Sequence, residues 1–600
     1  MENSEVKIPK RSEIAVPDTW DLSKLFGSEE DWNAGLAEFE KMIERIPAFQ
    51  GTLGKSADAL ADYLDFSRDM NILGERLGYY AQLKQAEDEG DSASRGRAGK
   101  ITMAGAKAQA ASAWENPEIL SIPEHDIEAF LVHDRLAGYR VYLRKIIRYK
   151  PHILSDKEER IIALHSESEG ALQDAFSVLT NVDFDFGSID TDEGKKPLSQ
   201  STWSVFMESS DRDLRQRAYE KFYAGFDTHK TTIAALYSGS VKQDVINARI
   251  RGFSSARKAA LFGNDVDESV YDNLISAVSG KLDSLHRYYE LRKRALKLDE
   301  LRHWDVYAPL VPVAKSRTSW DDAVDLVCKA LAPLGGEYVS ILKAGLSGRW
   351  ADRYENKGKH SGAFSAGSFS GDPYILMNYK EDSIRDVFTL AHEGGHSMHS
   401  WYSARNNPFT QYNYTIFEAE VASTLNEELL FRYLEKNTAD RETKLYLVNK
   451  HADDLLATLY RQTMFAEFEK ITHELEESGT PLTADLLRSE YRKLLEKYFG
   501  KAMVFEEASD LEGLRIPHFY NAFYVYKYAT GVSAALALAG RVLSGGEKEL
   551  EDYFAFLKSG GSRFPIDALK IAGVDMSGPR PVNAACDVFT CLVNELEGML

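Results

Sequence analysis

Residues 392–396 read His-Glu-Gly-Gly-His, and this spacing of histidines can hold a metal ion. Residues four apart lie one helical turn apart on the same face, so His392 and His396 can direct their imidazoles at one point. Two imidazoles supply two of the ligands of a tetrahedral zinc ion, and Glu393 beside them can reach a water on the metal without being a ligand. The pattern predicts a zinc site for hydrolysis. The alternative is an ordinary helix whose two histidines are satisfied by hydrogen bonds.

The sequence around this motif predicts a helix. Ser383 is a suitable N-cap, and Asp386 occupies the third helical position. Gly394 and Gly395, inside the helix, each cost about 1 kcal/mol relative to alanine. We expect that side chains there would obstruct a substrate strand or the helix that carries the third ligand. His399 lies about 10 Å further along the axis than the first histidine, so we expect a supporting or packing role for it.

A catalytic zinc ion needs a third protein ligand, and the candidates lie downstream. A second helical pattern begins near Ile416 and contains Glu418 and Glu420. These two positions are about 200° apart around a helix, so only one of the two side chains can point at the site. Spacing alone does not choose between them, and either could be a solvated surface carboxylate.

A second group of polar and aromatic residues lies between Arg515 and Gly531 and contains His518. Its other members fall into two stripes, Tyr520, Tyr524 and Tyr528 in one and Phe519, Phe523 and Tyr526 in the other. A tyrosine stripe at helical spacing usually belongs to a core, with its hydroxyls at the edge. The functional interpretation is that His518 and phenol hydroxyls donate hydrogen bonds to a scissile carbonyl, whose oxygen becomes negative in the transition state.

The elements that must position these groups are predicted to be mostly helical. The chain has 17 prolines in 600 residues, and helical patterns follow Ser28, Ser56 and Asp211 and run from Asp156 to about Leu179. The glycine-rich segment 358–379 instead alternates small residues with aromatics, so we expect short strands joined by glycine turns there.

The length predicts at least two lobes, because single cores stop growing near about 250–300 residues. A polar, aperiodic stretch at residues 190–201 contains Gly and Pro. We therefore predict a boundary there, between an N-terminal helical lobe, residues 1–200, and a catalytic domain, residues 201–600.

The charge and the cysteines exclude some classes of function and location. The net charge is -21, which disfavours binding to nucleic acid or to anionic membranes. Three cysteines are too few for a disulfide framework, and they favour a reducing compartment. The charged first residues lack the apolar core of a secretory signal, and no run is long enough to span a membrane. We expect a cytoplasmic protein.

Three segments together, 386–400, 417–427 and 517–531, resemble the oligoendopeptidase F group of the thimet-oligopeptidase-like zinc metallopeptidases. The resemblance extends over most of the chain, including 20–26, 362–379 and 579–581. It implies a mostly helical, two-lobed metallopeptidase of the zincin type. It further implies a deep central channel with zinc on its floor, a small β-sheet beside the active-site helix, and cleavage of short peptides.

The same resemblance implies roles for particular residues. Matched by motif position, one zinc ion is held by His392, His396 and Glu420, with Glu393 as the general base. The substrate and transition-state donors of the family are matched by a second set, His518, Tyr524 and Tyr526. Gly394 departs from the family pattern, which has a bulky apolar residue there, and this concerns the packing of the helix and not the binding of metal.

Our hypothesis from the sequence is a zinc endopeptidase that cleaves internal bonds of oligopeptides with metal-activated water. One alternative is a zinc exopeptidase or carboxypeptidase of similar fold. Another is a catalytically silent protein that binds peptides. The predicted partners are oligopeptide substrates, without nucleic acid or membrane, and the sequence does not determine the oligomeric state.

Overall fold

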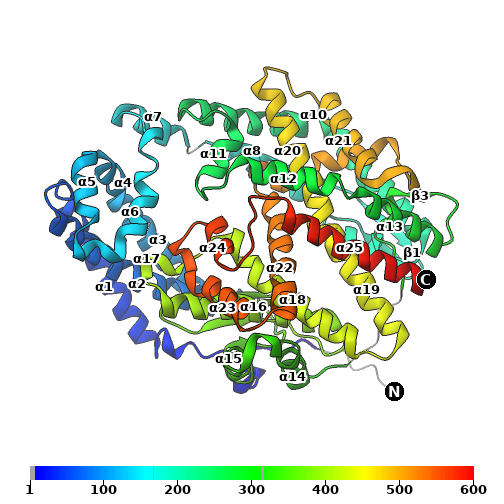
Figure 1. Ribbon diagram of the computed structural model, residues 1–600, viewed down its shortest axis with the longest axis horizontal. Helices are drawn as coiled ribbons and strands as arrows, with labels where there is room; N and C mark the ends of the chain where they lie inside the picture. Colours follow the sequence, from blue (N-terminus) through cyan, green and yellow to red (C-terminus); the bar gives the residue numbers. More distant parts are fainter. Residues whose placement is uncertain (1–6, 167, 312–316) are drawn as a thin grey trace. The chain divides into compact units, whose positions relative to one another are not determined.

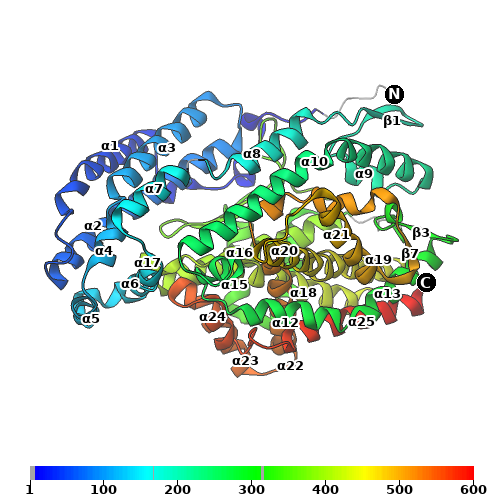
Figure 2. The ribbon, with the colours of Figure 1, turned by 90° about the horizontal axis from the view of Figure 1, so that it is seen from above.

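A computed structural model describes residues 7–166, 168–311 and 317–600 of the chain. These residues are mostly helical, with three small sheets of two or three short strands. Figure 1 shows the succession of helices along the chain, and Figure 2 shows the same ribbon from above. The predicted fold class, mostly α with a small sheet beside the helix of the His-Glu-Gly-Gly-His motif, is confirmed.

The chain divides into two compact units, each built from three separate stretches. The first unit contains the residues up to 151 together with 315–433 and 538–573, and the second contains 152–314, 434–537 and 574–600. Residues 190–201 lie within the second unit, so no boundary between the two units falls in this stretch of the chain. The division into regions 1–200 and 201–600 stays a prediction about the sequence, because compact units follow spatial contacts and not chain order.

The helices of the first unit fall into an N-terminal group and a group around the motif. The N-terminal group is α1 (Glu29–Arg45), α2 (Ala57–Glu87), α3 (Ser92–Ser112), α4 (Glu115–Ser121), α5 (Glu124–Leu131) and α6 (Arg140–Ile147). The later helices are α14 (Trp320–Ala330), α15 (Gly335–Ser347), α16 (Ile384–Asn406), α17 (Phe409–Tyr412), α18 (Ile416–Asn437, of which the last four residues belong to the second unit), α23 (Glu547–Ser559) and α24 (Pro565–Ile571). Helices α1, α2 and α3 lie side by side (Figure 2), and they bury Trp32, Phe39 and Leu77 between them.

Helix starts in this part follow the predicted caps. The Ser28 side chain accepts a hydrogen bond from the backbone N–H of Asp31 at the start of α1. Ser56 does the same for Ala59 at the start of α2. A capping oxygen of this kind satisfies one of the free N–H groups of the first helical turn, which fixes where the helix begins.

The sheet of the first unit has the order β4-β6-β5, formed by Ala351–Asp352, Pro373–Leu376 and Phe364–Gly367. Strand β6 is parallel to β4 and antiparallel to β5, with Ser365 opposite Ile375. The predicted strands within 358–379 are therefore confirmed. A Cβ atom at Gly367 would overlap the Cβ of Ser400, so the absence of a side chain lets the edge strand β5 lie directly on α16.

The second unit contains its own long helices and two small sheets. Its helices are α7 (Asp156–Ser166), α8 (Ala171–Val178), α9 (Trp203–Met207), α10 (Arg212–Ile250), α11 (Ala256–Phe262), α12 (Glu268–Ser279), α13 (Leu282–Ala295), α19 (Arg441–Leu455), α20 (Gln462–Glu477), α21 (Ala484–Phe499), α22 (Tyr526–Ser544, of which the last seven residues belong to the first unit) and α25 (Arg580–Met599). The strands are β1 (Ser188–Thr191), antiparallel to β2 (Gly194–Pro197), and β3 (Leu301–Arg302), parallel to β7 (Met503–Val504).

Two sequence predictions in this unit have different outcomes. The helix predicted after Asp211 is α10, whose first turn is capped by the Asp211 carboxylate. The pattern predicted to continue from Asp156 to about Leu179 divides into α7 and α8, with a turn before Gly170. Within the described residues, no helix is both long enough and apolar enough to cross a membrane.

Candidate metal centre

Helix α16 carries the two histidines of the motif, and a local hydrogen-bond network fixes its start. The Asp386 carboxylate accepts from the backbone N–H of Lys380 at 2.7 Å and from the Ser383 hydroxyl at 2.9 Å. The helix begins at Ile384, as predicted. The Ser383 oxygen accepts no backbone N–H of the helix, and its hydroxyl is linked to the first turn through the Asp386 carboxylate.

His392, His396 and Glu420 meet at one point. The Nε2 atoms of the two histidines are 3.1 Å apart. The Oε2 atom of Glu420 is 3.5 Å from Nε2 of His392 and 3.7 Å from Nε2 of His396. Tetrahedral zinc ligands at ordinary bond lengths lie about 3.3 Å from one another. The donor set of two imidazoles and one carboxylate therefore fits zinc in both chemistry and spacing. Within the described residues, no second trio of His, Cys, Asp or Glu side chains is this close.

The structure also distinguishes the two glutamates that spacing left open. Glu418 is buried, with 1% of its surface exposed, and its carboxylate accepts from the backbone N–H and the hydroxyl of Thr415, both at 2.9 Å. Burial raises its pKa to about 7, against the opposing effect of these hydrogen bonds. The Glu418 carboxylate is thus engaged by Thr415 at the start of α18, while Glu420 lies beside the histidines.

The two glycines of the motif occupy different surroundings. A Cβ atom at Gly395 would lie 2.6 Å from the carbonyl oxygen of Ala422 and 2.6 Å from the Cα of Ser423. The absence of a side chain at Gly395 thus lets α16 approach the backbone of α18, the helix that carries Glu420. At Gly394 a Cβ atom would lie 3.3 Å from the end of the Leu342 side chain. The expectation that a crossing helix explains a glycine here is confirmed for Gly395.

Glu393 lies beside the histidines in a nearly closed environment. Only 6% of its surface is exposed, and its Oε2 atom has no hydrogen-bond partner among the described residues. Burial raises its pKa to about 7, with His392 opposing this and the carboxylates of Glu420 and Glu427 adding to it. The backbone of Ser365 on β5 acts in the opposite direction and lowers the pKa of Glu393. A carboxyl group with such a pKa can take up and release a proton near neutral pH.

Glu427 is a residue of this site that the sequence analysis did not single out. Its Oε2 atom is 3.3 Å from Nδ1 of His392, and Nε2 of the same ring faces Glu420. The ring of His396 in turn donates to the backbone of Ala419. Such partners fix the orientation and the tautomer of metal-binding histidines. The signal in the sequence was the spacing, because Glu427 lies seven residues after Glu420, two turns along the same helix face.

His399 belongs to the packing of α16 and not to the ligand group. Its ring stacks on Tyr414, with the centroids 3.7 Å apart and the planes at 8°, and it also contacts Phe556. Only 1% of its surface is exposed, and burial lowers its pKa to about 3, so the ring is neutral. The expected packing role is confirmed.

The His518 to Tyr528 segment lies in the second unit and is not one continuous helix. A 3-10 turn, Pro517–Tyr520, is followed by Phe523 with φ +56°, and α22 begins only at Tyr526. The regular stripes that the sequence suggested are therefore interrupted, because the chain bends at Phe523.

This bend decides which of the predicted donors lie together. The rings of His518 and Tyr524 are stacked with centroids 6.3 Å apart, and the ring of Tyr528 contacts both. His518 is exposed, and Tyr524 and Tyr528 are half-buried. Tyr526 is fully buried, and its ring lies 5.2 Å from that of Tyr271. Tyr528 belongs to the predicted tyrosine stripe, although it is not one of the predicted donors.

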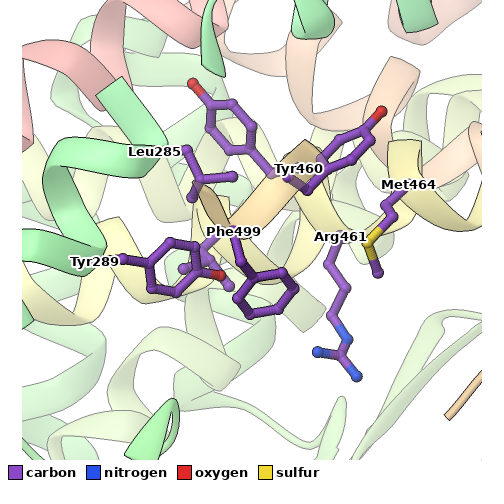
Figure 3. A pocket seen from close by; sticks show the side chains of 8 residues that line it. Leu285, Tyr289, Tyr460, Arg461, Met464 and Phe499 are labelled. Atoms are coloured by element: carbon purple, nitrogen blue, oxygen red, sulfur yellow. The ribbon is translucent and has the colours of Figure 1, made fainter. Parts of the chain in front are cut away.

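A small cavity in the second unit, shown in Figure 3, is lined mainly by apolar side chains. Its lining includes Leu285, Tyr289, Met464 and Phe499, together with the side chain of Arg461. The volume is about 10 Å³, which is about the space that one water molecule needs. This cavity cannot hold a peptide side chain.

Comparison with known proteins identifies the family. The sequence profile described as Peptidase family M3 matches residues 205–588, and a profile described as Oligopeptidase F matches residues 118–186. The chain belongs to peptidase family M3. The protein is therefore a metallopeptidase that acts on peptide bonds, and the predicted resemblance is confirmed.

Related proteins match this M3 family peptidase over nearly its whole length. Oligopeptidase PepF of Bacillus subtilis is 43% identical, over 99% of this chain and 89% of the relative. The oligoendopeptidase F homolog of Borreliella burgdorferi is 41% identical, over 98% of this chain and 99% of the relative. The crystal structure of oligoendopeptidase-F from Enterococcus faecium has a TM-score of 0.75 at 32% identity and covers 95% of this chain and 99% of its own.

Proposed function

We propose that the protein is a zinc-dependent endopeptidase that hydrolyses internal bonds of oligopeptides. The observation that carries the proposal is the convergence of His392, His396 and Glu420 within ligand distance, with Glu393 beside them. The similarity to proteins named oligoendopeptidase F supports the choice of oligopeptides as substrates.

The proposed metal is one zinc ion, held by His392, His396 and Glu420. When bound, zinc would supply a Lewis acid that polarises a carbonyl and makes a water more acidic. Glu427 would hold the ring of His392 in the orientation that leaves Nε2 free as a ligand atom.

Glu393 is proposed as the general base. Its raised pKa, about 7, and its Oε2 atom, which has no hydrogen-bond partner among the described residues, suit a group that accepts a proton from the attacking water. The protonated carboxyl group would then deliver that proton to the leaving amine, which restores the carboxylate for the next turnover.

Two further groups are proposed to bind the peptide. Strand β5 is an edge strand of its sheet, so its free edge suits pairing with a peptide backbone. His518, Tyr524 and Tyr526 are proposed as hydrogen-bond donors to the scissile carbonyl. The clustering of His518 with Tyr524 supports this role for those two, and for Tyr526 it stays a prediction.

The experiment that tests the proposal combines metal analysis with peptide cleavage. The purified protein should contain zinc and cleave a quenched fluorescent oligopeptide, lose this activity with a chelator and regain it with zinc. Glu393→Gln should keep the zinc and lose most of its turnover, whereas His392→Ala should lose both. A Gln variant that cleaves at the parent rate would refute the base assignment, and an active protein free of metal would refute the proposal as a whole.

The site of cleavage separates the endopeptidase from the other candidates. A peptide blocked at both termini should still be cut at an internal bond. Removal of one or two residues from an unblocked end alone would indicate an exopeptidase. A zinc-loaded protein without hydrolysis of any peptide in a mixed library would indicate a silent peptide-binding protein.

A further inference from the structure

Glu469 is a buried carboxyl group that the proposed mechanism does not use. It lies on α20 of the second unit with none of its surface exposed. Its Oε1 atom accepts a hydrogen bond from the backbone N–H of Phe523 at 2.8 Å. Its Oε2 atom is buried and has no hydrogen-bond partner among the described residues. A buried oxygen without a hydrogen-bond partner destabilises the folded state. An apolar side chain would therefore fill this space with less loss of stability.

The partner of Glu469 is a residue in an unfavourable backbone conformation. Phe523 has φ +56°, a left-handed value that bulky side chains rarely adopt and that persists only where the surroundings hold it. Its ring is buried between Tyr271, at 5.7 Å, and His473, at 4.5 Å. The hydroxyl of Tyr271 donates to the carbonyl of Ala466 at 2.6 Å. Helix α20 thus holds both the backbone and the ring of Phe523.

The bend at Phe523 sets the position of the residues on either side of it. The 3-10 turn with His518 comes before the bend, and α22 with Tyr526 and Tyr528 comes after it. The stacking of His518 on Tyr524 and the contact of both rings with Tyr528 depend on this reversal of the chain. With an extended or right-handed conformation at Phe523, the two sides of the segment would diverge.

We propose that Glu469 is a positioning residue, which holds the left-handed bend at Phe523 and thereby places His518 and Tyr524 for the peptidase reaction. The inference rests on the proposed function, in which these two side chains donate hydrogen bonds to the substrate. It adds a residue that touches neither substrate nor metal.

The protonation state of Glu469 suggests the conservative substitution. Burial raises its pKa well above the usual range, and the nearby Asp244 adds to this, although the hydrogen bond from Phe523 opposes it. Burial therefore favours the neutral form of the carboxyl group. Glutamine has the same shape, is also neutral and retains an acceptor oxygen. Leucine has a similar volume but offers no acceptor.

The first test compares variants of the full-length, zinc-loaded protein. Glu469→Leu should lower kcat for a quenched oligopeptide about tenfold to a hundredfold. The variant removes the hydrogen bond that stabilises the strained backbone at Phe523, and the free energy of such strain corresponds to this range of rates. Its zinc content should equal that of the parent. The kcat of Glu469→Gln should stay within about threefold of the parent value, because the contribution of a single hydrogen bond commonly varies by about this factor. Glu474→Leu makes the same change at an exposed position of α20 and should have no effect.

The second test uses the backbone conformation itself as a readout. Phe523→Ala and Phe523→Gly both remove the ring, but only glycine adopts a left-handed conformation at no steric cost. Glu469→Leu should therefore lower kcat strongly in the Ala background and only weakly in the Gly background. Hydrogen exchange measured by mass spectrometry should show faster exchange of the 521–526 amides in Glu469→Leu, and parental exchange in Glu469→Gln.

Several results would overturn the inference. Parental activity of Glu469→Leu would do so, as would equal losses in the Ala and Gly backgrounds. If Glu469→Leu does not fold, a Glu469→Gln variant with a large loss of kcat would refute the role of the acceptor, and one with parental kcat and exchange would support it. Parental activity of His518→Asn and Tyr524→Phe would instead refute the donor roles in the proposed function, while hydrogen exchange would still report whether Glu469 holds the bend.

Discussion

Gly395→Ala is expected to weaken zinc binding, because Gly395 on α16 lies against the backbone of α18, and these two helices carry the proposed ligands. The added methyl group would meet the carbonyl oxygen of Ala422 and the Cα of Ser423, both at 2.6 Å. Both atoms belong to the backbone of α18, so no side chain can rotate away. To restore an ordinary contact of 3.4 Å, the helices must separate by about 0.8 Å at this point.

The magnitude follows from two opposing contributions. Replacing glycine by alanine inside a helix stabilises the helix by about 1 kcal/mol. Overpacking against a rigid neighbour costs about 1–3 kcal/mol. Metal sites hold their ligand distances within about 0.2 Å, so a separation of the helices should act first on the distance between Glu420 and the histidines. The two contributions leave a net cost of up to about 2 kcal/mol, which corresponds to a loss of zinc affinity of up to about 30-fold.

The neighbouring glycine provides the matched control. At Gly394 the new methyl group would meet only the end of the Leu342 side chain, at 3.3 Å. Gly394→Ala gains the same helix propensity and presses on an atom that can move, so its zinc affinity should be parental and its thermal stability equal or higher. The affinity is measured by competition with a coloured chelator, and the unfolding temperature is measured with and without zinc.

The comparison of the two variants decides whether the reasoning is correct. If Gly395→Ala binds zinc as tightly as Gly394→Ala, the close approach of α16 and α18 does not control the geometry of the site. If both variants lose zinc equally, the loss comes from the helix itself and not from the crossing helix.

Three further predictions address the surroundings of the site and the effect of acid. Glu427→Gln should bind zinc about tenfold to a hundredfold more weakly by chelator competition, because the charged partner of the His392 ring is lost; an unchanged affinity would exclude this role. Acidification below about pH 6 should release zinc in equilibrium dialysis, since the ligand histidines must be neutral, and zinc retained at pH 4 would contradict the ligand assignment. Burial lowers the pKa of His303 from 6.5 to about 4, so the unfolded chain binds a proton at this position at a higher pH than the folded chain does. Stability should therefore fall as the pH drops from 6.5 to 4, by about 3 kcal/mol from this group, and the unfolding temperature of His303→Gln should decrease less over this range than that of the parent.

Some features of this protein could be predicted from the sequence because they depend on neighbours in the chain. Helix starts such as those after Ser28, Ser56 and Asp211 need only a capping side chain three or fewer residues before its partner. The pairing of His392 with His396 likewise follows from the helical repeat alone. The strands within 358–379 could be predicted from glycine turns between alternating residues.

The sequence by itself thus determined the helical character of the chain, the pair of histidines and the glutamate between them. The tertiary structure decided what depends on contacts between distant segments. It placed Glu420, and not Glu418, beside the histidines, brought Glu427 to the Nδ1 side of His392, and introduced a bend at Phe523 between His518 and α22. The physical reason is that periodicity fixes which face of a helix a residue occupies, whereas the packing of another helix decides what that face meets.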